Sequence, residues 1–370
     1  MLAGPADPLL SAAVPRCRRR RGVGLDVSGA GIGTKAALAI GLDVGGTKIA
    51  AGVVSARGEL LDRIAQPTPP PGSGEITLSL MLRLVQQLRQ RYPGVQAVGA
   101  GTAGLVGWPD GHVRWAPNNS YRDLPLRAIL SAETGLPAVV DNDANAAAWA
   151  EACLGAGAGR RDLLVLTVGT GIGAGLILGG RLYRGATGIG GEAGHIIVDP
   201  GGPQCGCGST GCLEALGSGG ALSRAGREAA GQDPDGTLAR LAGGPGQVTG
   251  ETVFAAARDG DATALALFAS AGYWLGVGIA SLASLLDSEL VVIGGGLSAA
   301  GDLLLGPARS AFERFVFARD HRALPPIVPA RLGPEAGIVG AALLALDSAP
   351  GQNPGAAVPA AADLAARGIV

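Results

Sequence analysis

Short runs of apolar residues that end in glycine, asparagine or aspartate dominate the chain from residue 39 onward. Between them, Leu80, Leu84 and Leu88 recur at the spacing of one helix face, which predicts a helix over residues 76–92. Short buried strands that alternate with helices are typical of an α/β protein. The runs that predict strands in this part of the chain are residues 39–44, 49–55, the run that ends at 64, 95–99 and 138–140.

The opening pattern returns in the middle of the chain. Residues 162–168, 174–178 and 181–183 predict three strands, joined by glycine turns at 169–173 and 179–180. A Gly-Thr turn separates the first two strands of each copy, so we interpret the pattern as an internal repeat of architecture. Two such units predict two related domains that face each other across a cleft.

Later apolar runs complete the expected organisation. They predict helices over 253–259, 262–286 and 337–346, and a strand over 290–293 that ends in three glycines. The expected segments are a disordered extension at 1–38, a small α/β domain at 39–148 joined by the helix 337–346, a large α/β domain with a metal site at 149–336, and a flexible tail at 347–370.

Composition narrows the class of protein. Of 370 residues, 47% are hydrophobic and 16% charged, which favours globular domains over disorder. The net charge of −1 gives no electrostatic reason to expect nucleic acid as a partner. We read no apolar run as a membrane span. We therefore expect a cytoplasmic protein. Its expected partners are a small molecule and further copies of the same chain, as a homo-oligomer (dimer or tetramer).

Three cysteines and a histidine form the most informative cluster. His195 precedes Cys205, Cys207 and Cys212, and glycines between the thiols let the chain fold back on itself. Three thiolates and one imidazole form the ligand set of a closed structural zinc site. The alternative is a loop held by a disulfide, which is disfavoured because nothing else indicates an oxidising compartment.

Three glycine-rich turns are candidate phosphate contacts, because glycine lets backbone N–H groups approach an anion closely. None has the Walker A spacing, and each alone could be an ordinary hairpin. Asp43, just before the first turn, could hold the water shell of Mg²⁺. The turn residues are Gly45, Gly46, Thr47 and Lys48, then Thr170 and Gly171, then Gly294, Gly295 and Gly296.

Polar residues at one strand-to-helix junction supply a candidate base. Asn142 and Asp143 follow a strand and precede an alanine run, where α/β sheets place their ligands. Asp143 could accept the proton of a substrate hydroxyl, or it could simply cap the helix. Asn118 lies in a loop, where an amide serves either a turn or the recognition of a hydroxyl. Glu192 and Glu214 flank the cysteine cluster and could hold a polyhydroxylated ligand together with His195.

These motifs resemble those of the ROK family, within the actin-like sugar kinases. Residues 43–48 resemble the family's first phosphate motif, 167–173 the second, and 290–298 the adenosine motif. The zinc signature, over 188–197 and 205–214, is the most specific match. The resemblance implies a two-domain actin-like ATPase fold of ribonuclease-H-like domains, with ATP and sugar in the cleft between them.

The resemblance also implies a role for each matching residue. Asp143 would be the base that acts on the sugar 6-hydroxyl, in an enzyme that uses ATP and Mg²⁺ and carries structural Zn²⁺. The residues that would bind the sugar hydroxyls are Asn118, Asn142, Glu192, His195 and Glu214, and the zinc ligands would be His195, Cys205, Cys207 and Cys212. We expect a glucokinase, with an N-acetylhexosamine kinase as the alternative within the family and a non-catalytic sugar sensor as the alternative of another class.

Departures from the family pattern bear on the choice of sugar. Gly101-Thr-Ala-Gly104 stands where many members have a proline-containing turn, and Asn119-Ser-Tyr121 replaces a Leu-x-Trp segment. Fewer than forty residues precede the first predicted strand and they lack helical periodicity, so we do not expect the helix-turn-helix domain of the family's repressors.

Overall fold

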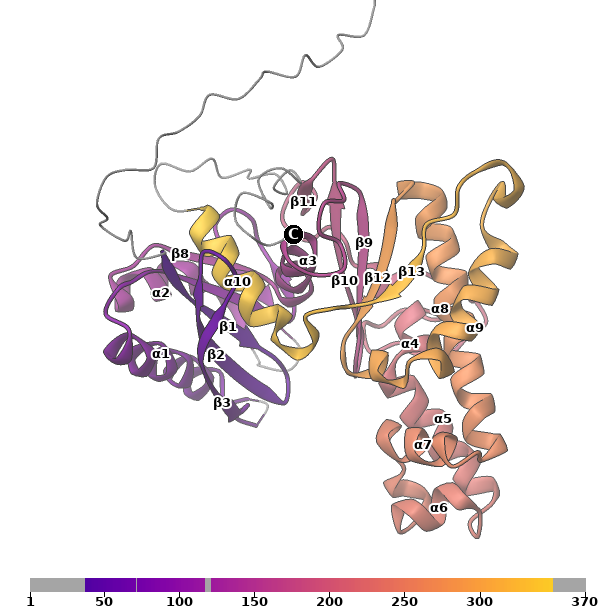
Figure 1. The fold of residues 1–370 in the computed structure, drawn as a ribbon. Helices are drawn as coiled ribbons and strands as arrows, with labels where there is room; N and C mark the ends of the chain where they lie inside the picture. Colours follow the sequence, from indigo (N-terminus) through magenta and orange to yellow (C-terminus); the bar gives the residue numbers. More distant parts are fainter. Residues whose placement is uncertain (1–36, 71, 117–120, 349–370) are drawn as a thin grey trace, which may run out of the picture. The chain divides into compact units, whose positions relative to one another are not determined.

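The computed structural model describes residues 37–70, 72–116 and 121–348. The predicted extension at 1–38 and tail at 347–370 lie almost wholly outside these residues, as does Asn118. The described residues belong to one compact unit of the chain. Figure 1 shows two sheets with helices beside and between them.

The first sheet has the strand order β3-β2-β1-β4-β8. β1 is antiparallel to β2 and parallel to β4, and β4 is parallel to β8. Along the carboxyl edge, Asp43 lies opposite Gly101, and Thr102 lies opposite Asn142. The strands are β1 (Leu38–Val44), β2 (Lys48–Ser55), β3 (Leu60–Pro67), β4 (Val95–Thr102) and β8 (Ala138–Asn142).

The second sheet repeats this topology, which confirms the repeat predicted from the Gly-Thr turns. Its order is β11-β10-β9-β12-β13, with β9 antiparallel to β10 and parallel to β12. A third sheet, β5-β6-β7, follows β4. The strands of these two sheets are β9 (Leu163–Val168), β10 (Ile172–Leu178), β11 (Arg181–Tyr183), β12 (Leu290–Gly294), β13 (Ile327–Pro329), β5 (Leu105–Val106), β6 (Val113–Trp115) and β7 (Arg122–Leu124).

Alternating side chains of the central strands explain why both faces of each sheet are covered. Ile40 and Leu42 of β1 join one apolar cluster, which also contains the buried leucines of α1 (Gly74–Arg91) and α2 (Leu126–Thr134). Ala39 joins a different cluster, built on α3 (Asp143–Cys153) and α10 (Ala336–Asp347). Because successive residues of a strand point to opposite faces, an apolar run such as β1 requires helices on both sides.

The same alternation in β9 defines the packing of the second sheet. Leu163 and Val165 join the α3–α10 cluster, so these two helices lie between the sheets (Figure 1). Leu164 and Leu166 join a third cluster on the other face. The helices of this second half are α4 (Leu213–Gly217), α5 (Gly219–Gln232), α6 (Thr237–Ala242), α7 (Gly250–Arg258), α8 (Ala262–Leu286) and α9 (Asp302–Phe315), with short 3₁₀ turns at 193–195, 245–247, 296–300, 319–321 and 333–335.

Three glycines allow the central helices to approach the first sheet closely. A Cβ atom at Gly41 of β1 would lie 1.9 Å from the carbonyl oxygen of Ile338, and one at Gly99 of β4 would lie 1.8 Å from that of Ala341. A Cβ atom at Gly340 would lie 1.7 Å from the carbonyl oxygen of Ala146 in α3. No side chain fits at these contacts, so glycine is required where α10 crosses β1, β4 and α3.

Helix α8 alters the sequence-based argument about membranes. Its 25 residues carry no charge, and α8 is the one helix among the described residues that is long and apolar enough to cross a membrane. Half of the apolar window is buried within the protein, where Phe268, Leu275 and Ile279 belong to the core of the second half. We therefore assign α8 to the protein core because of this packing, and not because the sequence lacks a long apolar run.

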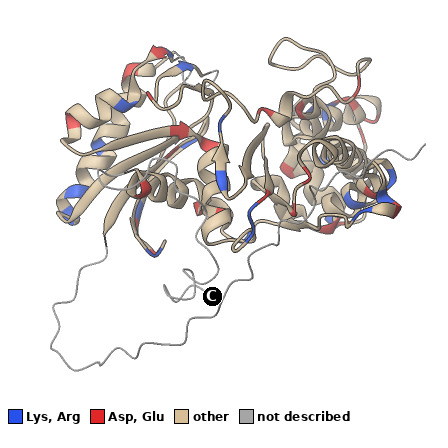
Figure 2. Cartoon of the chain, turned by 90° about the horizontal axis from the view of Figure 1, so that it is seen from above, with Lys and Arg blue, Asp and Glu red and all other residues tan. Residues whose placement is uncertain are grey.

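Element boundaries differ from the prediction in places that matter for the site. β4 runs three residues beyond the predicted end at Gly99, to Thr102, and β10 begins at Ile172, which shortens the second Gly-Thr turn. The elements that were not predicted are helices α2, α4, α5, α6 and α9 and strands β5, β6, β7 and β13. Figure 2 shows basic and acidic segments spread over both halves, in keeping with the net charge of −1.

Candidate active site

A cavity of about 650 Å³ lies where the carboxyl ends of the first sheet meet the second Gly-Thr turn and the cysteine cluster. Of the sequence-predicted residues, it brings together the helix-junction pair, both flanking glutamates, the histidine and glycines of the turns. The lining residues are Gly46, Ala103, Gly104, Leu105, Trp115, Asn142, Asp143, Thr167, Gly169, Thr170, Gly171, Ile172, Gly173, Glu192, His195, Cys207, Glu214 and Gly295.

The sequence left open whether Asp143 caps the helix or acts as a base. At the junction of β8 and α3, the cap is Asn142. The Oδ1 atom of Asn142 accepts hydrogen bonds from the backbone N–H groups of Ala144, at 2.8 Å, and Asn145, at 3.2 Å. Asn142 is therefore the N-cap of α3, and its Nδ2 atom donates to the carbonyl oxygen of Gly104, at 3.3 Å. Asp143 is the first residue of the helix, and its Oδ1 atom accepts a hydrogen bond from the N–H of Ala144, at 2.9 Å.

Burial controls the ionisation of the two aspartates beside the cavity. Desolvation raises the pKa of Asp143 above its usual value, although backbone hydrogen bonds oppose the shift. Desolvation also raises the pKa of Asp43 to about 6, and the neighbouring Asp143 charge adds to the shift. Asp143 therefore has the raised basicity that suits a general base for a hydroxyl.

Asp43 and Asp143 both line a smaller cavity of about 160 Å³, together with Thr167 and Gly294. A Cβ atom at Gly337 would come within 2.8 Å of the Asp43 carboxyl carbon, so the carboxylate fills a space that glycine leaves open. One or two carboxylates plus water and phosphate are what Mg²⁺ prefers, so this pair of carboxylates fits a magnesium site.

The first Gly-Thr turn touches the cavity through a single described residue. Gly46 lines it, whereas Thr47 and Lys48 are exposed. The N–H of Gly45 donates to the carbonyl oxygen of Lys48, at 3.0 Å, and the Thr68 hydroxyl donates to the carbonyl oxygen of Gly45, at 2.7 Å. These bonds fix the turn, and Thr68 is a contributor that the sequence did not suggest.

The second Gly-Thr turn separates the main cavity from another of about 460 Å³. The first N–H groups of α5, from Gly219 and Gly220, donate to the carbonyl oxygens of Gly169 and Thr170, at 2.7 and 3.0 Å. Thr170 and Gly296 are the predicted nucleotide-binding residues that line this second cavity. The other lining residues are Gly169, Gly219, Gly220, Ser223, Thr249, Gly250, Glu251, Phe254, Leu297, Ala299 and Ala300.

The remaining predicted glycines take other positions. Gly171 and Gly295 line the main cavity, and Gly294 lines the small one. Gly295 has a φ of 81°, and a Cβ there would lie 2.4 Å from the carbonyl oxygen of Val168. Sequence reasoning missed the segments around Gly219 and Thr249, because only the fold brings them beside the Gly-Thr turn.

Glu214 is held in the cavity wall by the turn itself. Its Oε2 atom accepts a hydrogen bond from the N–H of Ile172, at 2.9 Å. A Cβ atom at Gly171 would lie 2.3 Å from the same oxygen. Gly171 therefore leaves room for the Glu214 carboxylate. From the sequence, Gly171 is only a candidate phosphate contact, and this requirement was not predicted.

Glu192 lines the cavity and directly precedes the short 3₁₀ helix that ends at His195. Glu192 is exposed to water, but it lines a concave cavity, so protein atoms also lie around its side chain. Desolvation raises the pKa of Glu192, while the nearby His195 opposes the shift. The sequence did not indicate Leu105 and Trp115, which also line the cavity.

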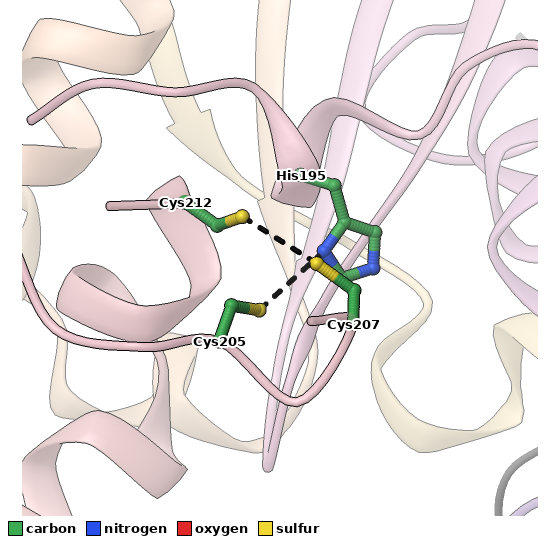
Figure 3. A group of neighbouring side chains, drawn as sticks. All are labelled: His195, Cys205, Cys207 and Cys212. Atoms are coloured by element: carbon green, nitrogen blue, oxygen red, sulfur yellow. Dashed lines mark hydrogen bonds between the residues drawn. The ribbon is translucent and has the colours of Figure 1, made fainter. Parts of the chain in front are cut away.

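The cysteine cluster forms a compact group next to the cavity (Figure 3). The four candidate ligand atoms, from His195, Cys205, Cys207 and Cys212, all lie within 4.8 Å of one another. The Cys207 and Cys212 sulfurs are 3.6 Å apart, and Cys205 Sγ is 3.7 Å from His195 Nδ1. Two sulfurs on one tetrahedral zinc ion would be roughly 3.8 Å apart, so these two distances and the ligand set fit a zinc site.

The metal group and the cavity share His195 and Cys207, and Glu214 provides a further contact between them. Cys205 Sγ lies 3.7 Å from Glu214 Oε1, and His195 lines the cavity while its Nδ1 atom faces Cys205. Figure 3 shows the second ring nitrogen on the side of the imidazole away from Cys205 and Cys212. A metal held here would orient His195 and support Glu214 from behind.

Two sheets of the same strand order, with helices between them and a cavity at the converging strand ends, define the two-domain actin-like ATPase fold. Residues 39–348 match the ROK family. The chain therefore belongs to the ROK family.

Several known proteins are similar to this chain. The glucokinase of Streptomyces coelicolor is 42% identical over 316 residues, which cover 85% of this chain and 99% of that protein. The N-acetylmannosamine kinase of Escherichia coli is 35% identical over 311 residues, which cover 83% and 97%. The crystal structure of a ROK family glucokinase from Streptomyces griseus in complex with glucose and AMPPNP has a TM-score of 0.77 and 42% identity, and the match covers 84% of this chain and 100% of that one.

Proposed function

We propose that this protein is a glucokinase that transfers the γ-phosphoryl group of ATP to the 6-hydroxyl of glucose. The observation that carries the proposal is the half-buried Asp143, which stands in the wall of a cavity with Glu192, His195 and Glu214. A second cavity adjoins it at Gly169 and Thr170, where a nucleotide can reach the same turn. The glucokinases named above support the choice of sugar and donor.

The proposed reaction is a direct transfer. Asp143 takes the proton of the sugar hydroxyl as that oxygen forms a bond to the γ-phosphorus. The bond from the γ-phosphorus to the bridging oxygen breaks, and ADP leaves with that oxygen. Asn142, Glu192, His195 and Glu214 hold the other sugar hydroxyls and exclude wrong orientations, with Asn118 as a further candidate outside the described residues.

Two metals complete the proposal. Asp43 would hold Mg²⁺, which when bound neutralises charge on the phosphates. Zinc would be bound by His195, Cys205, Cys207 and Cys212 and would serve structure, because protein atoms fill all four positions. The turns at 45–48, 170–171 and 294–296 would contact the nucleotide.

The proposal includes organisation and location. We assign residues 39–148 with the helix 337–346 to one domain, and 149–336 to the other, so that the sugar and ATP bind between them. The protein would act in the cytoplasm as a homo-oligomer. Two exposed apolar side chains support the oligomer: Leu285, near the end of α8, is 80% exposed, and Phe317, two residues after α9, is 75% exposed.

The experiment is a coupled assay of ADP release from ATP or polyphosphate. Glucose is compared with N-acetylglucosamine, N-acetylmannosamine and fructose. We expect turnover with ATP and glucose. Turnover on an N-acetylated sugar alone would move the specificity to the second candidate, which the 35% identical N-acetylmannosamine kinase favours. Absence of turnover by folded protein would overturn the proposal and favour a sensor.

Replacement of the base tests the mechanism. Asp143→Ala should lower kcat by about 10²–10⁴ with little change in glucose affinity, because general-base help is worth that much. Calorimetric titration with glucose checks the affinity. The control is Asp62→Ala, which removes a half-buried carboxylate on β3 that pairs with Arg91 outside the cavity. Wild-type kcat in Asp143→Ala would contradict the assignment.

A further inference from the structure

A buried ion pair joins the edge strands of the two sheets beside the candidate base. The Nε atom of Arg184, directly after β11, lies 2.7 Å from Oδ2 of Asp141 in β8. The two side chains are only 12% and 4% exposed. β8 and β11 are the edge strands of different sheets, so the pair links the two halves of the fold.

Asp141 passes this link on to the helix that carries the base. Its Oδ1 atom accepts hydrogen bonds from the backbone N–H of Asn142 and from Nδ2 of Asn145, both at 2.8 Å. These two residues are on either side of Asp143 in the first turn of α3. A carboxylate fixed by Arg184 therefore fixes the backbone from which the Asp143 side chain projects.

Arg184 also packs against the hairpin that forms another wall of the cavity. Its guanidinium carbon lies 3.7 Å from the centre of the Trp108 ring, which is a cation–π contact. Trp108 lies in the loop between β5 and β6. The N–H of Trp108 donates to the carbonyl oxygen of Thr187, at 3.2 Å, and a Cβ atom at Gly188 would lie 2.4 Å from the same nitrogen. The segment after Arg184 therefore packs closely against this hairpin.

That segment leads directly to a sugar-binding candidate. The N–H of Gly190 donates to the carbonyl oxygen of Arg184, at 2.9 Å, which closes a loop just before Glu192. One guanidinium group therefore contacts the β8–α3 junction and the cavity hairpin, and its backbone closes the loop that precedes Glu192. Neither the sequence nor the proposed reaction gives Arg184 a role.

We propose that Arg184 is a positioning residue for phosphoryl transfer, which fixes Asp143 in one half of the fold relative to Glu192 in the other. The inference rests on the proposed function, because it takes Asp143 as the base and Glu192 as a sugar ligand. Arg184 acts through Asp141 and Trp108 and does not itself line the cavity. A planar guanidinium can bond to a carboxylate edge and stack on an indole at once, which a lysine ammonium cannot do.

The experiment compares Arg184→Gln, Arg184→Lys, Asp141→Asn and the Asp141→Asn/Arg184→Gln double variant. Arg181→Gln, three residues earlier and exposed on β11, is the matched control. We expect Arg184→Gln to lower kcat by roughly ten- to a hundredfold and to raise the KM for glucose, since misplacement of reacting groups has effects of that size. The KM for ATP should stay within about twofold, because the second cavity does not touch the pair.

The variants separate positioning from folding. Arg184→Lys should fall between wild type and Arg184→Gln, and the double variant should lose no more than the worse single variant, because the residues act through one another. Wild-type kcat and glucose KM in Arg184→Gln would overturn the inference. The inference would also be overturned if the KM for glucose and the KM for ATP changed equally and the loss of activity in Arg184→Lys matched its fraction of unfolded protein. Absence of turnover in wild type and Arg181→Gln would overturn the proposed function itself, and the inference with it.

Discussion

Single side chains at the site owe their properties to what surrounds them more than to their own type. Asp143 is an ordinary carboxylic acid until the α3 junction buries it and raises its pKa. Gly171 is an ordinary turn residue until Glu214 occupies the space where its Cβ would be. The sequence identified both residues, but it could not give the reason for the glycine, because the glutamate lies 43 residues away in the chain.

The pH dependence of the rate should report the burial of Asp143. A base acts in its deprotonated form, so kcat/KM for glucose should fall as the pH drops through the pKa of Asp143. Because desolvation raises that pKa, the acid limb should lie above the ordinary carboxyl value of 3.8. Rates between pH 4 and 8 check this, with samples returned from low pH to pH 8 to exclude irreversible unfolding. A rate that stays flat down to pH 4 would contradict the prediction.

At the scale of elements, the cysteine loop should depend on its metal for its shape. Metal analysis should find about one zinc per chain, and Cys207→Ser should lose the metal, lower the melting temperature and weaken glucose binding. The affinity should fall because the loop holds His195 and supports Glu214. Cys153→Ala, whose thiol lies in α3 outside the cluster, should keep the zinc. Unchanged affinity and stability in Cys207→Ser would sink the structural role.

Helix contacts supply a second prediction at this scale. Gly340→Ala should destabilise the fold by roughly 1–3 kcal/mol, because its Cβ would lie 1.7 Å from the Ala146 carbonyl oxygen and would push α10 away from α3. Gly231→Ala, also inside a helix but with no atom within 4 Å of its Cβ, should be neutral or stabilising by up to about 1 kcal/mol. Denaturant unfolding compares the two. Equal stability of both variants would show that the close approach is not limiting.

Elements with strong local patterns were predicted well, and those set by distant partners were not. The predicted helix over 262–286 coincides with α8, and the strand over 181–183 coincides with β11. β4 extends to Thr102 because it pairs with both β1 and β8 along that length, which no local pattern reveals. The second cavity was only partly foreseen, since tertiary packing brings residues of α5 and α7 beside the Gly-Thr turn.

On the scale of the whole molecule, two Gly-Thr turns were enough to predict the repeated topology. Assembly into an oligomer depends on which side chains are exposed, and no sequence pattern identifies these. Light scattering should give a multiple of the mass of one chain. Leu285→Ser combined with Phe317→Ser should reduce it, because removing two exposed apolar side chains weakens an apolar contact. Leu61→Ser, an exposed apolar residue on β3, serves as the control. A wild-type mass of a single chain would refute the oligomer.

The position of α10 has a consequence for synthesis on the ribosome. The face of the first sheet that contains Ala39, Gly41 and Gly99 is covered by a helix that begins at Ala336. The chain emerges from its amino end, so strands made early must wait through nearly the whole of translation for their cover. The first half of the fold is therefore translated first but completed last, and during that wait its bare apolar face is open to chaperones and to other nascent chains.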